Sequence, residues 1–223
     1  MSIHLNVANV VVPATNGNSL AKLVAIPVAE APWDCIELRL DRFAVTPVNI
    51  ATPLLLTPRH PDEGGDPRCA TDAQRAAIAE PWLPFASAID VELAHADGMS
   101  PTLQRAKDAG LAVVLSLHDF ESTPAADLLS DRVRRAIDAG ADVVKLATLT
   151  ETASDVARLI SLFEEFPEQR LAVMGMGRLG MASRLLAACC GSVLNYASHG
   201  DATADGQWPA ADFRRLLEQT GAR

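Results

Sequence analysis

The sequence predicts a (β/α)8 barrel of the TIM type, formed by a single domain over residues 1–223. Eight short segments rich in valine, isoleucine and leucine recur along the chain, and most intervals between them carry apolar residues at three- and four-residue spacing. Strands that alternate with helices pair in parallel. With 49% hydrophobic residues, the chain is long enough for one barrel and too short for two comfortable domains.

The expected elements follow one another in a regular order. The expected strands are residues 22–28, 35–41, 53–59, 86–93, 111–118, 142–149, 170–177 and 192–198. The expected helices are residues 72–82, 100–110, 125–140, 151–166 and 179–191. Two of these helices end in KDAG and IDAG, and a glycine at that place is typical of a helix C-terminal cap that leads into the next strand.

The beginning of the chain departs from this order. Only AEAPWD separates the first two expected strands, which is too short and too proline-bound for a crossover helix, so we expect a truncated first crossover. The second connection, residues 42–52, has room for one or two helical turns at most. Alternation in IHLNVANVVV predicts that residues 1–20 form an extra hairpin or arm that covers the bottom of the barrel.

An open doubly wound sheet is the alternative architecture. Gly175, Gly177 and Gly180 match the G-x-G-x-x-G pattern of dinucleotide-binding proteins. That pattern belongs to the first βα unit, whereas here it follows the seventh expected strand. The glycines are therefore interpreted as positions where the backbone approaches a ligand at the barrel mouth.

Composition excludes several classes of partner. Lysine and arginine total 19 against 28 acidic residues, and the net charge of −9 argues against nucleic acid and anionic membranes. Cys35, Cys69, Cys189 and Cys190 lack the spacing of a zinc site or a disulfide framework, so we expect reduced structural thiols and no metal. Without a long apolar stretch or a signal peptide, the chain is expected to be soluble and cytoplasmic.

Polar residues gather late in seven of the eight expected strands, where barrel enzymes have their active sites. They are Glu37, Arg39, Asp41, Arg59, Asp90, Glu92, Ser116, His118, Lys145 and Arg184. Taken singly, a strand-end histidine is often structural, and Glu37 with Arg39 is readily explained as an ion pair at the rim. Burying so many ionisable groups around one cavity without a function would cost several kcal/mol, so the set indicates an active site.

Lys145 lies in the apolar run DVVKLATLT, and a lysine is rarely buried without compensation. An amine desolvated among Arg39, Arg59 and Arg184 is expected to favour the free nucleophile, which attacks a carbonyl to form a Schiff base. His118 is placed to remove a proton from the carbon next to the iminium. The arginines are expected to anchor an anionic, hydroxylated substrate, with no metal and no cofactor.

Between about residues 35 and 208 the chain carries, in order, ELRLD, TPRxxxEGG, DVEL, SLHDFxxTP, KLA, MGxxGxxSR and ADGQ. This set resembles the type I 3-dehydroquinate dehydratase family. The resemblance implies a TIM barrel lyase of the shikimate pathway, which makes precursors of the aromatic amino acids. It converts 3-dehydroquinate to 3-dehydroshikimate through a lysine Schiff base, and such enzymes are commonly homodimers.

The resemblance also implies a role for each matching position. Lys145 would capture the substrate ketone, His118 would be the general acid and base, and Glu63 would orient that histidine. Residues implied to bind substrate are Glu37, Arg39 and Arg59 at the ring hydroxyls, and Arg184, Thr203 and Gln207 at the carboxylate and its closing loop. Met174 and Met176 would wall the pocket.

Two departures from the family pattern stand out. The closing loop reads Thr203-Ala204-Asp205-Gly206-Gln207, where the family usually has Ser-Ala-Pro-Gly-Gln. Threonine keeps the hydroxyl, whereas losing the proline and gaining Asp205 are expected to affect affinity or loop closure more than chemistry. The truncated first crossover would leave one side of the barrel to be covered by the N-terminal arm or a partner subunit.

Two other functions fit parts of the pattern. A class I aldolase would use the same lysine, but it would usually need a phosphate cradle from loops seven and eight, and the EGG and LHDF motifs have no reason to occur in it. A catalytically silent barrel that binds a dehydroquinate-like ligand would be marked by a lost lysine or histidine, and both residues are present.

Overall fold

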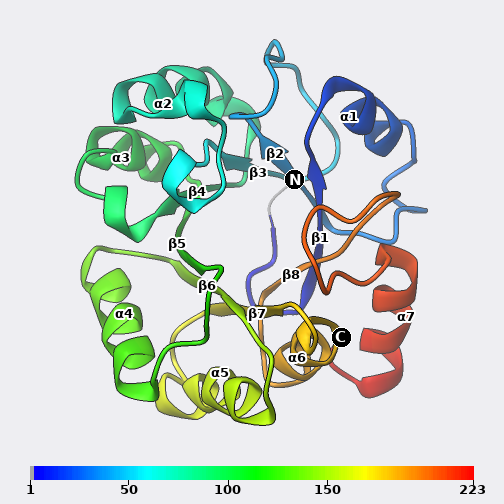
Figure 1. Cartoon of the computed structure of the whole chain (residues 1–223). Coiled ribbons are helices and arrows are strands. Elements are labelled where there is room, and N and C mark those ends of the chain that lie inside the picture. Colours follow the sequence, from blue (N-terminus) through cyan, green and yellow to red (C-terminus); the bar gives the residue numbers. More distant parts are fainter. Residues whose placement is uncertain (1–2) are drawn as a thin grey trace.

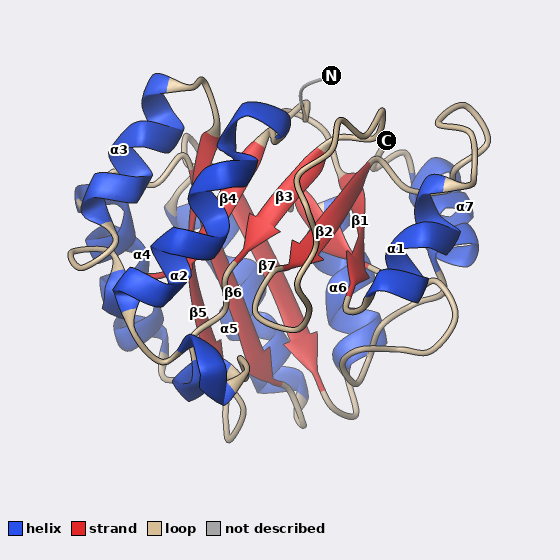
Figure 2. Ribbon diagram, turned by 90° about the horizontal axis from the view of Figure 1, so that it is seen from above, coloured by secondary structure: helices blue, strands red, loops and turns tan. Residues whose placement is uncertain are grey.

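The computed structural model describes residues 3–223 and consists of eight parallel strands that curl into a nearly closed barrel with helices around it (Figures 1 and 2). The sheet order is β7-β6-β5-β4-β3-β2-β1-β8. The strands are β1 Asn9–Ala14, β2 Cys35–Arg39, β3 Leu54–Thr57, β4 Ala88–Glu92, β5 Ala112–Asp119, β6 Val143–Leu149, β7 Leu171–Met176 and β8 Leu194–Tyr196. The expected (β/α)8 fold is confirmed.

The α-helices lie on the outside of this sheet, as Figure 1 shows. They are α1 Gly17–Val24, α2 Asp72–Ala79, α3 Ser100–Asp108, α4 Ala126–Asp138, α5 Ala153–Glu165, α6 Gly180–Cys189 and α7 Ala210–Thr220. Four short 3₁₀ turns complete the described chain: η1 Pro61–Glu63, η2 Pro67–Cys69, η3 Glu80–Phe85 and η4 Leu93–His95. None of the helices within residues 3–223 has the length and apolar character needed to cross a membrane.

The barrel closes between its first and last strands. β1 pairs with both β2 and β8 in parallel, and on the other side the backbone N–H of Val193 donates to the carbonyl of Leu171 at 2.9 Å. One apolar layer lies inside the barrel, and a larger one lies between the sheet and the helices. Because all strands run the same way, their C-terminal ends meet at one face of the barrel.

The predicted beginning of the chain is wrong. The first strand is residues 9–14 instead of 22–28, and residues 17–24 form the first crossover helix, α1. The side chain of Asn16 accepts from the backbone N–H of Ser19, and Ser19 caps the backbone N–H of Asn16, which starts a helix that the apolar run KLV continues. The first crossover is therefore not truncated, and that side of the barrel is covered.

The second connection behaves as its sequence predicts. Residues 40–53, all described, contain no helix, so β2 and β3 are joined by an extended loop. Phe43, Val45 and Ile50 of this loop pack against the outer apolar layer in the place of a helix.

The C-terminal helix α7 was not among the expected helices.

An N-terminal arm does cover the bottom of the barrel, although it is shorter than expected. Ile3 and Leu5 pack against the apolar layer inside the barrel, and Figure 1 shows the first residues passing across the ring of strands. The buried side-chain amide of Asn9 donates to the carbonyls of His4, Val7 and Val193, at 2.9, 2.9 and 3.0 Å. This amide joins the arm to the barrel wall.

We expect Asn9→Ala to lower the free energy of unfolding by roughly 1–3 kcal/mol, because it leaves carbonyls without their donor at a buried position. Asn6→Ala is the matched control, since Asn6 lies in the same arm but is exposed and bonds only to Arg170. The control should change stability by less than about 0.5 kcal/mol. Urea denaturation measures both values, and equal effects would show that Asn9 does not hold the arm.

Candidate active site

A cavity of about 300 Å³ opens at the C-terminal end of the barrel. It is lined by Met174 and Met176 and by the nine residues that the resemblance implies to act in catalysis or substrate binding: Glu37, Arg39, Arg59, Glu63, His118, Lys145, Arg184, Thr203 and Gln207. Asp41, Asp90, Glu92 and Ser116, which the sequence analysis also singled out, do not line it. The lining residues come from six different strands or the segments that follow them. The barrel therefore brings together residues that are far apart in the sequence, as expected for this face.

Lys145 extends from the middle of β6 into this cavity and is only 3% exposed. Its Nζ donates to Asp90 Oδ2 at 2.8 Å and to the hydroxyl of Tyr196 at 3.1 Å. The same nitrogen lies 4.0 Å from Glu37 Oε1 and 4.2 Å from the centre of the Tyr196 ring. A buried carboxylate, a hydroxyl and an aromatic face thus replace the water that the amine has lost.

The expectation that three arginines surround the amine is wrong. Arg59 binds Asp90 at 2.9 Å and Glu92 at 2.8 Å, and Arg39 binds Asp41 through two hydrogen bonds. Acidic and basic residues alternate at these strand ends, so both guanidinium groups are paired with carboxylates, and Arg59 shares Asp90 Oδ2 with Lys145. The charge nearest the amine is consequently negative.

Asp90 connects Lys145 to the rest of the buried polar network. Its Oδ1 accepts from the hydroxyl of Ser116 at 2.6 Å, and Ser116 accepts from Arg59 at 2.6 Å. Burial alone would raise the pKa of Asp90, but Arg59 and Lys145 outweigh it and hold that pKa well below its usual range. Asp90 is therefore a permanent negative charge beside the amine.

His118 lies near the end of β5 and is held by Glu63 of η1. Glu63 Oε2 accepts from the backbone N–H of His118 at 2.9 Å and lies 2.8 Å from its Nδ1. Because Glu63 Oε2 already accepts the backbone N–H of His118, it is also placed to accept the ring N–H, and we assign the ring hydrogen to Nδ1. This tautomer leaves the lone pair on Nε2.

The surroundings also set the charge of this pair. Burial, with the positive charges of Arg59 and Lys145, holds the pKa of His118 well below its usual value, while Asp90 opposes them. Burial raises the pKa of Glu63 to about 7 against the opposite influence of Arg59. His118 is hence a neutral imidazole at physiological pH, which is the state a general base requires.

Arg184 is 2% exposed and is the cation least satisfied by the protein. Its Nη1 donates to the backbone carbonyl of Tyr196 at 3.2 Å, while its Nε has no hydrogen-bond partner within residues 3–223. No carboxylate of the described chain lies within ion-pair distance of it, and burial lowers its pKa to about 10. A buried guanidinium that faces a cavity without an anion is suited to bind one from outside.

The loop of residues 198–209 forms one wall of the cavity. Thr203 and Gln207 line it and bind each other, with the backbone N–H of Thr203 donating to Gln207 Oε1 at 2.9 Å. The loop rests on α6, because Gly180 and Gly206 approach so closely that a Cβ on Gly180 would lie 2.8 Å from Gly206 Cα. Asp205 of this loop is exposed and does not line the cavity.

Three residues of the cavity were missed by the sequence analysis. Tyr196 ends β8 and contacts Lys145; Phe120 lies over His118 with ring centres 6.0 Å apart; and Arg42 donates to the carbonyl of Gly64 at 2.8 Å. Tyr196 had a usable signal, since it lies at the C-terminal end of an expected strand. Burial and the nearby carboxylates Glu37 and Asp90 raise its pKa well above the usual value, so its hydroxyl stays protonated.

Comparisons with known proteins agree on one family. The family model described as Type I 3-dehydroquinase matches residues 10–223. A 3-dehydroquinate dehydratase from Methanococcoides burtonii is 31% identical over 203 residues, which cover 85% of this chain and 86% of the relative. One from Salmonella typhimurium is 31% identical over 219 residues, which cover 88% and 86%. The crystal structure of 3-dehydroquinate dehydratase from Geobacillus kaustophilus superposes with a TM-score of 0.84 at 26% identity, over 97% of this chain and 93% of that one.

We expect Gly180→Ala to push the loop of residues 198–209 away from α6, because the new Cβ would collide with backbone atoms that cannot rotate away. Amide hydrogens in the loop should then exchange roughly tenfold faster. Gly17→Ala is the control, since Gly17 is also helical and has no atom within 4 Å of an added Cβ. Unchanged exchange in Gly180→Ala would show that the loop does not depend on this contact.

Proposed function

This chain belongs to the type I 3-dehydroquinase family and is a 3-dehydroquinate dehydratase, and we propose that Lys145 and His118 carry out its reaction through an imine intermediate. The observation that carries this proposal is a buried lysine that shares one cavity with a neutral histidine. The reaction is a lyase step of the shikimate pathway, in which 3-dehydroquinate loses water to give 3-dehydroshikimate.

The first step forms the imine. Lys145 gives up a proton, for which the neutral His118 in the same cavity is a suitable acceptor, and its Nζ then attacks the ketone carbon of the substrate. The proton that His118 accepted is returned to the hydroxyl of the carbinolamine, which leaves as water, so that an iminium ion and a neutral His118 remain. The positive charge is again on Nζ, beside Asp90 and the Tyr196 ring, so the groups that stabilise the ammonium also stabilise the intermediate.

The second step is the dehydration. The iminium acidifies the adjacent carbon, and Nε2 of His118 accepts the proton from that carbon. The electron pair left behind forms the enamine and then expels the hydroxyl group on the next carbon, which takes a proton from His118 and leaves as water. Hydrolysis of the new conjugated iminium releases the enone product and restores the amine of Lys145.

Substrate binding is assigned by charge. Arg184 binds the substrate carboxylate, because its guanidinium is buried and lacks an anion among the described residues. Thr203 and Gln207 cover that carboxylate from the loop. Glu37 and Arg39 bind ring hydroxyls, and Arg59 contributes as part of the network that holds Asp90.

Three broader expectations are kept as proposals. The chain forms a single domain, which the match of one family model to residues 10–223 supports. It is a homodimer, which light scattering in solution tests, and it is located in the cytoplasm, which fractionation of the source cells tests.

Adding 3-dehydroquinate to the protein should raise the ultraviolet absorbance, because the product is a conjugated enone and the substrate is not. Lys145→Ala should abolish the rise, and it should still fold, because Asp90 keeps its ion pair with Arg59. Lys22→Ala is the control, since Lys22 is exposed on α1. Borohydride added with substrate should attach the reduced ligand to Lys145 alone.

The other two functions give different results in this experiment. A class I aldolase would be trapped by borohydride with other ketones and would give no enone from 3-dehydroquinate. A silent barrel would bind 3-dehydroquinate calorimetrically without any change in absorbance. Either result with folded protein would contradict the dehydratase assignment.

In the pH profile of kcat/KM, activity should be lost on the acid side only below pH 6.5, which is the usual pKa of histidine. The reason is that the folded protein lowers the pKa of His118. The base therefore stays neutral as the pH falls through 6.5, and activity is lost only when it is finally protonated. His118→Asn should reduce the rate by about 10²–10⁴-fold, whereas His199→Asn, at an exposed position, should not. Tryptophan fluorescence shows whether the protein stays folded, and an acid limb above pH 6.5 in folded protein would contradict the assignment.

A further inference from the structure

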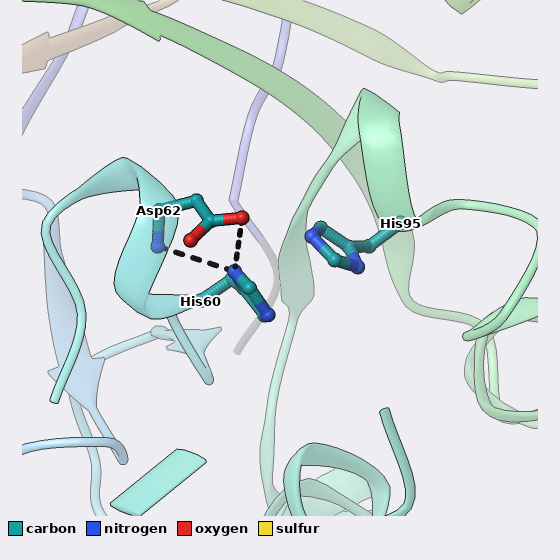
Figure 3. A group of neighbouring side chains, drawn as sticks. All are labelled: His60, Asp62 and His95. Atoms are coloured by element: carbon teal, nitrogen blue, oxygen red, sulfur yellow. Dashed lines mark hydrogen bonds and ion pairs between the residues drawn. The ribbon is translucent and has the colours of Figure 1, made fainter. Parts of the chain in front are cut away.

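Three potential metal ligands meet beside the active site, outside its cavity. His60 follows β3, Asp62 lies in η1, and His95 ends η4. One ligand atom from each lies within 4.8 Å of the others, and Figure 3 shows the Asp62 carboxylate facing both imidazoles. None of the three lines the cavity described above.

The nearest polar partners of the two imidazoles indicate which nitrogen carries the proton: a carbonyl within hydrogen-bond distance for His60 and a carboxylate at ion-pair distance for His95. His60 Nε2 lies 3.1 Å from the carbonyl of Ala70, which only accepts, so Nε2 is the donor and Nδ1 keeps its lone pair. His95 Nδ1 lies 3.2 Å from Asp72 Oδ1, so the hydrogen is on Nδ1 and the lone pair on Nε2. In Figure 3 the nitrogen of His95 on the far side from its attachment points toward Asp62.

This is the arrangement that histidine ligands of metals adopt. A metal-bound imidazole usually donates its other N–H to a backbone carbonyl or a carboxylate, which orients the ring and raises its basicity. Ala70 supplies the carbonyl for His60, and Asp72 supplies the carboxylate for His95. Asp72 is itself fixed by Arg75 at 3.0 Å, so the second partner is held in place.

The spacing also fits a small ion. His60 Nδ1 lies 3.5 Å from Asp62 Oδ2, and two ligands about 2.0–2.2 Å from a tetrahedral ion are separated by roughly that distance. Asp62 is exposed, with 82% of its side chain accessible, so it can adjust to the ion. The only donor toward these atoms within the described cluster is the backbone N–H of Asp62, at 3.2 Å from His60 Nδ1.

Stacking of the His60 and His95 rings explains only part of this arrangement. The rings of His60 and His95 are 3.9 Å apart at 29°, as in many structural pairs. Stacking does not account for a carboxylate that faces two lone pairs, of which only that of His60 Nδ1 has a donor within the described cluster. A cation between them would satisfy all three acceptors.

We propose that His60 Nδ1, Asp62 Oδ2 and His95 Nε2 bind one divalent transition-metal ion of the zinc class, with water as the fourth ligand. Two imidazoles and one carboxylate suit zinc or cobalt and are poor ligands for magnesium or calcium. The ion would tie η1, which carries Glu63, to η4, which follows β4. The site is independent of the dehydratase reaction, because none of its three ligands is assigned to substrate or proton transfer.

Zinc chloride titrated calorimetrically into the full chain should bind at one ion per chain. Every protein in the test carries Cys189→Ser and Cys190→Ser, because both thiols are free and exposed and thiolates are zinc ligands in general. Asp62→Asn and His95→Gln should each weaken binding at least tenfold. Asp97→Asn and His4→Gln are the matched controls, since both positions are exposed and lie outside the cluster, and they should bind like the parent.

Cobalt chloride provides a second measurement that does not depend on activity. The parent should show the strong visible absorption of four-coordinate cobalt, and Asp62→Asn should not. Asp62 is exposed, so this substitution leaves the packing of the fold unchanged. Magnesium chloride should bind to neither protein at this site. The proposal is overturned if the parent shows no saturable zinc binding, or if Asp62→Asn and His95→Gln bind zinc as tightly as the parent.

Discussion

The carboxylate of Asp90 is the group on which the active site depends. It binds Lys145 at 2.8 Å and Arg59 at 2.9 Å, and without it two buried cations would face each other across the cavity. Removing one partner from a buried ion pair costs roughly 3–5 kcal/mol, which is a large share of the about 5–15 kcal/mol that stabilises a typical protein. The network is therefore a constraint on folding as well as on chemistry.

The network continues outward along β4. Glu92, two residues after Asp90 and on the same face, binds Arg59, Arg75 and the backbone N–H of His60. A continuous series of ion pairs thus leads from the outer helix α2 to the amine of Lys145. Arg39 lies outside this series but is paired with Asp41, whereas Arg184 has no carboxylate partner among the described residues. Arg184 is therefore the cation available for an anionic substrate.

The sequence was sufficient to locate the site because strand ends can be recognised from apolar runs, and parallel strands bring their ends together. It failed at residues 22–28, since a short apolar run fits a helix as well as a strand and the Asn16–Ser19 cap was not recognised. The prediction from the sequence also placed arginines around Lys145, whereas the nearest charge in the structure is the carboxylate of Asp90. The partners of the Lys145 amine depend on the register of the strands, which places Ser116 opposite both Glu92 and Lys145. Register cannot be read from one sequence. The cluster of His60, Asp62 and His95 was also missed, because its members follow two different strands and their spacing in the sequence does not show that they meet.

The N-terminal arm lies at the bottom of the barrel, and this position bears on how the protein can be fused to another protein or immobilised on a surface. Residues 3–7 close the bottom of the barrel, and Arg223 reaches the same end, where its guanidinium binds the carbonyl of Ala8 at 3.3 Å and the carboxylate of Asp34. Figure 2 shows the C-terminus on the side opposite the strand arrowheads. A surface, a reporter or a second enzyme joined at either end would lie behind the barrel, and the cavity would face away from it into solution.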